Sequence, residues 1–97
     1  MNVKENQTRL RRIVLAFVAE RYPAAYTADA IRQRVNQSGM LDAPATTPEV
    51  LDALRTLASD RFHWADLMVD EDGVQHWGAT PAGVRHWTLT GSLYVGG

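Results

Sequence analysis

Three histidines each stand directly before a tryptophan, and these pairs are the residues most able to do chemistry. The pairs are His63-Trp64, His76-Trp77 and His86-Trp87. Three imidazoles can bind a zinc ion and leave one coordination position open. The spacings of 13 and 10 residues match no local ligand motif, however. Packing is the favoured interpretation: neighbours in a strand point to opposite faces, so each indole enters the core while its histidine faces out. We therefore predict no metal site.

The tryptophans have a second interpretation. An indole ring that stays on the surface can anchor a protein partner, because aromatic side chains dominate interaction hot spots. Trp64, Trp77 and Trp87 are the candidate residues for such a partner site.

Other catalytic signatures are missing from the sequence. It contains no nucleophile elbow, no paired acid and base, and no phosphate-binding glycine loop. It also contains no cysteine, which excludes disulfides and thiolate metal sites. We expect no catalytic residues, no cofactor and no enzyme activity.

Length and composition predict one globular domain over residues 1–97. The chain has 97 residues, of which 45% are hydrophobic. No apolar run approaches the ~20 residues of a membrane span. The N-terminus lacks the apolar segment of a signal peptide. We expect a cytoplasmic protein without membrane contact.

Charge is distributed unevenly along the chain, although the net charge is only −1. Residues 1–40 contain seven Lys or Arg and three acids, whereas residues 41–97 contain three Arg and eight acids. A polyanion should therefore meet the N-terminal half and be repelled by the C-terminal half.

Helical periodicity and capping residues predict three helices. Residues 1–7 are expected to be flexible, and Thr8 to cap a helix over 9–22 that Pro23 ends. Thr27 should cap a second helix to Gln37, with Gly39 after its end. Thr47 should cap a third helix to Asp60, with a proline in its first position.

A hairpin and a short terminal segment should follow. Strands are predicted at 67–69 and 74–79, joined by the turn Asp70-Glu71-Asp72-Gly73. Thr80-Pro81-Ala82-Gly83 looks like the start of a short final helix or turn. The tail, 88–97, alternates apolar residues and is expected to form a third strand or an edge that pairs with another chain.

Two segments carry a resemblance to a known family. Residues 26–31 (YTADAI) resemble the beginning of the second helix of winged helix-turn-helix proteins, and residues 74–83 (VQHWGATPAG) resemble their second wing strand and the following turn. The resemblance implies an α+β, mainly α, three-helix domain with a C-terminal hairpin wing. It also implies a recognition role for the third helix and a small, dimeric transcriptional regulator that binds double-stranded DNA.

Candidate DNA contacts follow from this resemblance and from the positions of the cations. The candidates for phosphate binding are Arg9, Arg11, Arg12, Arg32 and Arg34. The candidates for the groove or the wing are Arg55, Thr56 and Gln75.

The sequence departs from the family in two respects. The connector between the second and third helices is about nine residues long, where a tight helix-turn-helix has ~3–4. The third helix and the hairpin tip carry mostly acids, which repel phosphates. The alternative function is therefore a winged-helix module for protein contact or homodimerisation that does not bind DNA.

Overall fold

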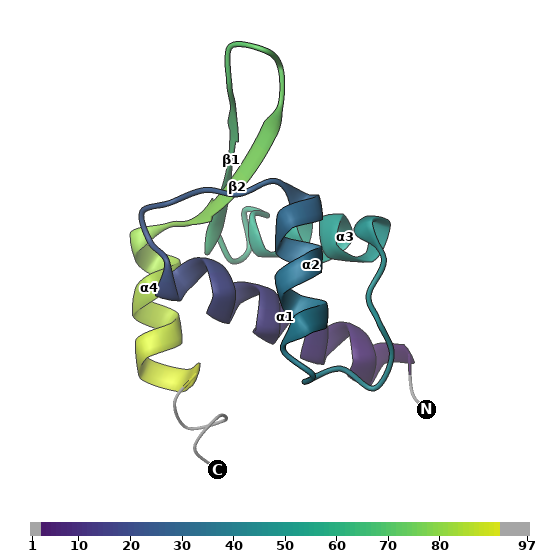
Figure 1. Cartoon of the computed structure of the whole chain (residues 1–97). Helices are drawn as coiled ribbons and strands as arrows, with labels where there is room; N and C mark the ends of the chain where they lie inside the picture. The colour runs from purple at the N-terminus through teal and green to yellow at the C-terminus, as the bar shows by residue number, and fades with distance from the viewer. Residues whose placement is uncertain (1–2, 92–97) are drawn as a thin grey trace.

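The computed structural model describes residues 3–91 and places them in an α+β, mainly helical fold (Figure 1). In chain order, the elements are α1 (Val3–Glu20), α2 (Ala28–Gln37), α3 (Thr47–Leu57), β1 (Ala65–Val69), β2 (Gln75–Ala79), α4 (Pro81–His86) and the π-helical turn η1 (Trp87–Gly91). The three first helices form the body, and the β1–β2 hairpin projects from it (Figure 1).

Helix α1 is the central element of the core. Its apolar face, including Leu10, Val14 and Val18, is buried, as the helical spacing of these residues indicates. Leu15 lies outside that face and is buried as well, because α4 and η1 also pack on α1. The expected start at residue 9 after a flexible segment is wrong, since α1 begins at Val3. No proline or glycine interrupts residues 3–8, so the helix continues through them.

The two shorter helices begin at side-chain caps. Thr27 Oγ1 accepts a hydrogen bond from Ala30 N at 3.2 Å, which confirms the predicted start of α2. The cap of α3 is Thr46, one residue before the predicted Thr47. Glu49 explains the shift: a capping box needs a carboxylate three residues after the cap, and Glu49 accepts the Thr46 N–H at 2.9 Å. Helix α3 ends at Leu57, before the predicted Asp60.

The long connector between α2 and α3 is held by one side chain. Asn36 Nδ2 donates to Ala45 O at 3.0 Å, and Asn36 Oδ1 accepts from Ala45 N at 2.8 Å. These two hydrogen bonds hold the end of the connector (residues 38–46) against α2, so that α3 begins beside α2. Gly39 has a φ of 72°, in agreement with the predicted helix end.

The predicted hairpin is present, and β1 is longer than predicted because it begins at Ala65 and not at residue 67. Strands β1 and β2 are antiparallel, and Met68 pairs with His76. Gly73 has a φ of 81° in the turn, as predicted. Tyr26 adds an isolated bridge on the far side of β2: its backbone donates to Trp77 O at 2.9 Å and accepts from Trp77 N at 2.7 Å.

A helix follows the hairpin, so the hairpin is not the C-terminal element. Thr80 caps α4: its Oγ1 accepts from Gly83 N at 3.0 Å and donates to His63 O at 2.6 Å. The expected strand over 88–97 is wrong for residues 88–91, which continue the helical course of α4. Residues 92–97 lie outside the described residues.

Candidate nucleic-acid interface

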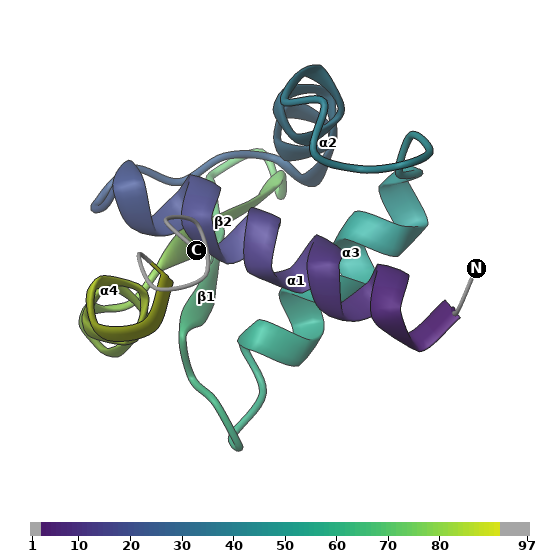
Figure 2. The same cartoon turned by 90° about the horizontal axis from the view of Figure 1, so that it is seen from below.

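An open hollow of about 880 Å³ runs along the outer side of α1. Figure 2 shows α1 in front, with α2 on one side of it and α4 on the other. The walls come from these three helices and from the segment around Phe62 and Trp64 that precedes β1.

Cations dominate the charged part of the lining of this hollow. Among the described residues, its charged lining consists of five arginines and one glutamate: Arg9, Arg11, Arg12, Arg21, Arg34 and Glu20. We call this surface the arginine hollow. Four of the five arginines predicted to bind phosphate therefore lie on one surface, although they come from two helices.

The fifth predicted phosphate ligand lies elsewhere. Arg32 faces Asp29 on α2, with 3.0 Å between Arg32 Nη2 and Asp29 Oδ1, and a second hydrogen bond from Nε at the same distance. Asp29 also accepts from Gln33 at 3.0 Å, so this carboxylate is the centre of a small network. Arg32 thus serves a local ion pair and takes no part in the arginine hollow.

Arg9 and Arg21 of the hollow contact other parts of the chain. Arg9 Nη1 lies 3.3 Å from Asp42 Oδ2, and both side chains are about half exposed. Arg21 lies over the Phe17 ring, 4.0 Å from its centroid, and donates to Phe17 O at 3.2 Å. Exposed ion pairs contribute little free energy, so a phosphate can replace Asp42 as the partner of Arg9 at low cost.

Stacked aromatic rings form one wall of the hollow. The Trp64 ring lies 4.5 Å from Phe62 and 3.7 Å from His86, centroid to centroid, and stacks on both. Trp87 follows His86 and is half-buried in the same wall. This stack brings two of the three His-Trp pairs together, because His86 of the third pair packs on Trp64 of the first pair.

The third tryptophan belongs to the core. Trp77 is 4% exposed, so the proposed surface set of Trp64, Trp77 and Trp87 is not brought together as one patch. His76 lies beside Asp70 at 3.9 Å on the hairpin, away from the His86 stack. Within the part of the chain that the structure describes, no group of three His, Asp or Glu side chains could hold a metal ion.

The predicted groove-contacting residues lie on α3 and on the hairpin. Arg55 and Gln75 are exposed. Thr56 is half-buried, and its Oγ1 donates to Asp52 O at 3.0 Å, so the hydroxyl hydrogen is already used inside the helix. These three residues are separate from the arginine hollow, whose lining includes none of them.

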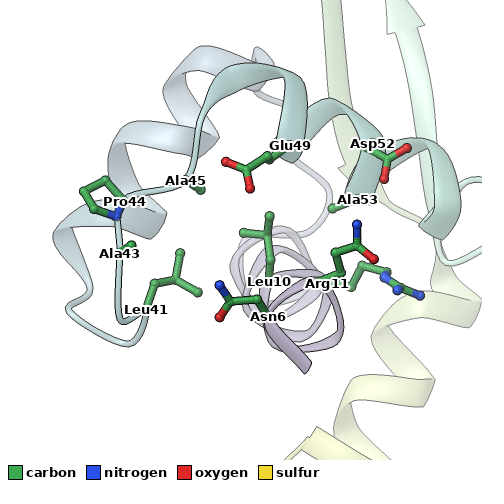
Figure 3. A pocket seen from close by; sticks show the side chains of 11 residues that line it. Asn6, Leu10, Arg11, Leu41, Ala43, Pro44, Ala45, Glu49, Asp52 and Ala53 are labelled. Atoms are coloured by element: carbon green, nitrogen blue, oxygen red, sulfur yellow. The ribbon is translucent and has the colours of Figure 1, made fainter. Parts of the chain in front are cut away.

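A smaller hollow between α1 and α3 shows the acidity of the third helix. Its volume is about 220 Å³. Glu49 and Asp52 of α3 line it together with Arg11 and Asn6 of α1 (Figure 3). Two carboxylates and one guanidinium line this hollow, so the surface beside α3 is poorly suited to phosphate. Nothing in the sequence places Arg11 near α3, since this depends on how α1 and α3 pack.

The hairpin is acidic and apolar. Residues 65–79 include four acids and no lysine or arginine. Leu67, Met68, Val69 and Val74 are all more than a third exposed. The sequence shows the acids of the turn but does not predict this exposed apolar surface, since alternation alone does not show how far a hairpin projects from the body.

No family model matches the chain, and comparison with curated proteins and with solved structures finds no match either. Among the described residues, every helix is too short or too polar to cross a bilayer.

Proposed function

We propose that this chain is a small winged-helix protein that binds DNA through the arginine hollow, and not through α3 and the hairpin. The element order supports the winged-helix part of the proposal. Three helices precede the hairpin, and the Tyr26–Trp77 bridge gives β2 a second, very short neighbour from the segment between α1 and α2. Helix α4 then extends this arrangement beyond the hairpin.

One observation carries the proposed interface: five arginines and a single glutamate line one open hollow. Arginine is suited to phosphate because its planar guanidinium donates several hydrogen bonds and stays charged. Binding of a polyanion there would release counterions, which is the main source of non-specific affinity for DNA. The α3 and hairpin surfaces would gain nothing from this effect, since they carry more acids than cations.

The aromatic wall favours contacts to the phosphate backbone of DNA over contacts to its bases. Stacking of a base needs a free ring face. Trp64 already stacks on Phe62 and on His86. We therefore propose duplex DNA, recognised by its phosphates with little sequence preference, as the ligand.

Anisotropy titrations with a labelled duplex and with its separate strands test this proposal. The duplex is expected to bind at low salt, with a log–log salt slope of about −4.5 if five arginines neutralise phosphates. The pair Arg12→Glu and Arg34→Glu is expected to weaken binding by roughly 30-fold, because it removes two phosphate contacts and adds two repulsive charges.

The matched control changes the charge equally outside the hollow. Arg55→Glu with Arg85→Glu alters exposed arginines of α3 and α4 that do not line the arginine hollow. This pair is expected to weaken binding by only ~3-fold, through screened long-range repulsion. Equal losses from both pairs, or no binding of the duplex at low salt, would refute the proposed interface. Tighter binding of the single strands than of the duplex would show that single-stranded DNA, and not duplex DNA, is the ligand.

The hairpin favours a second candidate function, contact with a protein. It exposes several apolar side chains close together, with Val69 58% and Met68 43% accessible, and exposed apolar patches mark sites of protein contact. This function does not exclude DNA binding, because the hairpin and the arginine hollow are distinct surfaces.

A further inference from the structure

The hairpin tip presents acids and apolar side chains together. Glu71 and Asp72 are exposed in the turn, and Val69 and Val74 flank it with 58% and 43% of their surfaces accessible. The hairpin projects from the body, so its tip can reach another molecule (Figure 1).

The free edge of β1 is poorly suited to adding another strand. The backbone N–H and C=O of Trp77 both bond to Tyr26, on the side of β2 away from β1. Trp77 and Leu67 are therefore a non-hydrogen-bonded pair of the ladder, and the N–H and C=O of Leu67 point to the outer edge of β1. Asp66 Oδ1 accepts that outward Leu67 N–H at 2.9 Å. A carboxylate on the edge blocks pairing with a further strand. A partner should therefore meet the side chains of the tip and not the backbone of the edge.

The same chain contains a surface of complementary character. The arginine hollow has five arginines against one glutamate, and Met40 adds an apolar side chain that is 53% exposed. The hairpin has four acids over residues 65–79 and no lysine or arginine. Opposite charge on two surfaces favours their contact and disfavours hairpin-to-hairpin contact between like charges.

We propose that the hairpin tip of one copy docks in the arginine hollow of a second copy. The contact would be heterologous, because two different surfaces of the chain meet, and such contacts form rings or open chains of subunits. Glu71 and Asp72 would meet the arginines, while Val69 and Val74 would cover Met40 and the Trp87 wall. This proposal goes beyond the proposed DNA binding and does not depend on it.

Charge reversal on each surface tests the docking. Glu71→Lys with Asp72→Lys reverses the tip. Asp70 is kept, because its carboxylate accepts from Asp72 N and Val74 N at 2.9 Å and holds the turn. Arg12→Glu with Arg34→Glu reverses the hollow. Circular dichroism and thermal unfolding of each variant check that the fold is kept.

Sedimentation velocity over a concentration series at low salt then reports association. The unmodified chain is expected to exceed its monomer mass of 10.8 kDa as concentration rises. Each reversed pair alone is expected to stay at the monomer mass. The chain that carries both reversed pairs is expected to associate again, because its charges are exchanged and complementary.

Three results would overturn the docking. One is a monomer at every concentration of the unmodified chain. Another is association that survives reversal of the hollow, which would indicate a symmetric contact through the hairpin. The third is failure of the doubly reversed chain to associate. The anisotropy titration separates this proposal from DNA binding, since reversal of the tip is expected to abolish self-association and to leave affinity for the duplex no weaker.

Discussion

Replacement of Trp77 by alanine is expected to lower the free energy of unfolding by about 4 kcal/mol, the typical cost of truncating a buried tryptophan. The indole is 4% exposed within the core cluster that joins α1 to the hairpin. The Trp77 backbone also makes both hydrogen bonds of the bridge to Tyr26. Most domains are stable by only ~5–15 kcal/mol, so this loss would bring the protein close to unfolding at room temperature.

Chemical denaturation with circular dichroism measures this effect, and Trp87→Ala is the matched control. Trp87 is half-buried in the wall of the arginine hollow, so its truncation is expected to cost about 1 kcal/mol. Trp77→Phe should cost less than Trp77→Ala, because it keeps a ring and removes an indole N–H that has no hydrogen-bond partner. Equal costs for Trp77→Ala and Trp87→Ala would contradict the assignment of Trp77 to the core.

Replacement of Gly83 by alanine is expected to destabilise the protein by about 3 kcal/mol through overpacking. A β-carbon at position 83 would lie 2.9 Å from Trp64 C and 3.0 Å from Trp64 Cα, and closer still to Trp64 O. These are backbone atoms, which cannot rotate away. Alanine would gain only ~1 kcal/mol in helix propensity over glycine, so the clash dominates.

The neighbouring position gives the control for α4. Ala82 is exposed, so Ala82→Ser is expected to change stability by no more than about 0.5 kcal/mol. If Gly83→Ala proved as stable as the unmodified chain, α4 would not rest on the Trp64 backbone as described. The hydrogen bonds of Thr80 to His63 and Gly83 would then need another explanation.

Local signals predicted much of the fold. Thr27 acts through its side-chain cap, and Pro48 and Gly73 act through their backbone geometry. The beginnings of α2 and α3 and the hairpin turn therefore follow from short stretches of sequence, to within a residue. The pairing of Met68 with His76 follows from the turn. Two errors, at residues 3–8 and 88–91, concern segments that lack strong start or stop signals. The alternation of apolar residues after Thr88 predicts a strand, but residues 88–91 continue the helix that Thr80 caps.

The candidate site was predictable only in part. The excess of arginine in residues 1–40 indicated the basic half of the chain, and four of the five candidate phosphate ligands line one hollow. The spacing of Asp29 and Arg32, three residues apart on a helix, was a signal for their ion pair that the prediction of Arg32 as a phosphate ligand did not use. Sequence could not place Arg21 in the same hollow, since that position depends on how α1 packs between α2 and α4.

Backbone amide chemical shifts, followed by NMR during titration with a DNA duplex at low salt, show where the polyanion lies on the protein. If DNA contacts the side of α1 that carries the arginine hollow, the largest shifts will fall in residues 8–21, 34–40 and 86–90, which hold most of the hollow's lining. Shifts in α3 and in the hairpin turn will be small. Shifts concentrated in residues 47–57 and 70–75, with little change along α1, would contradict binding in the arginine hollow.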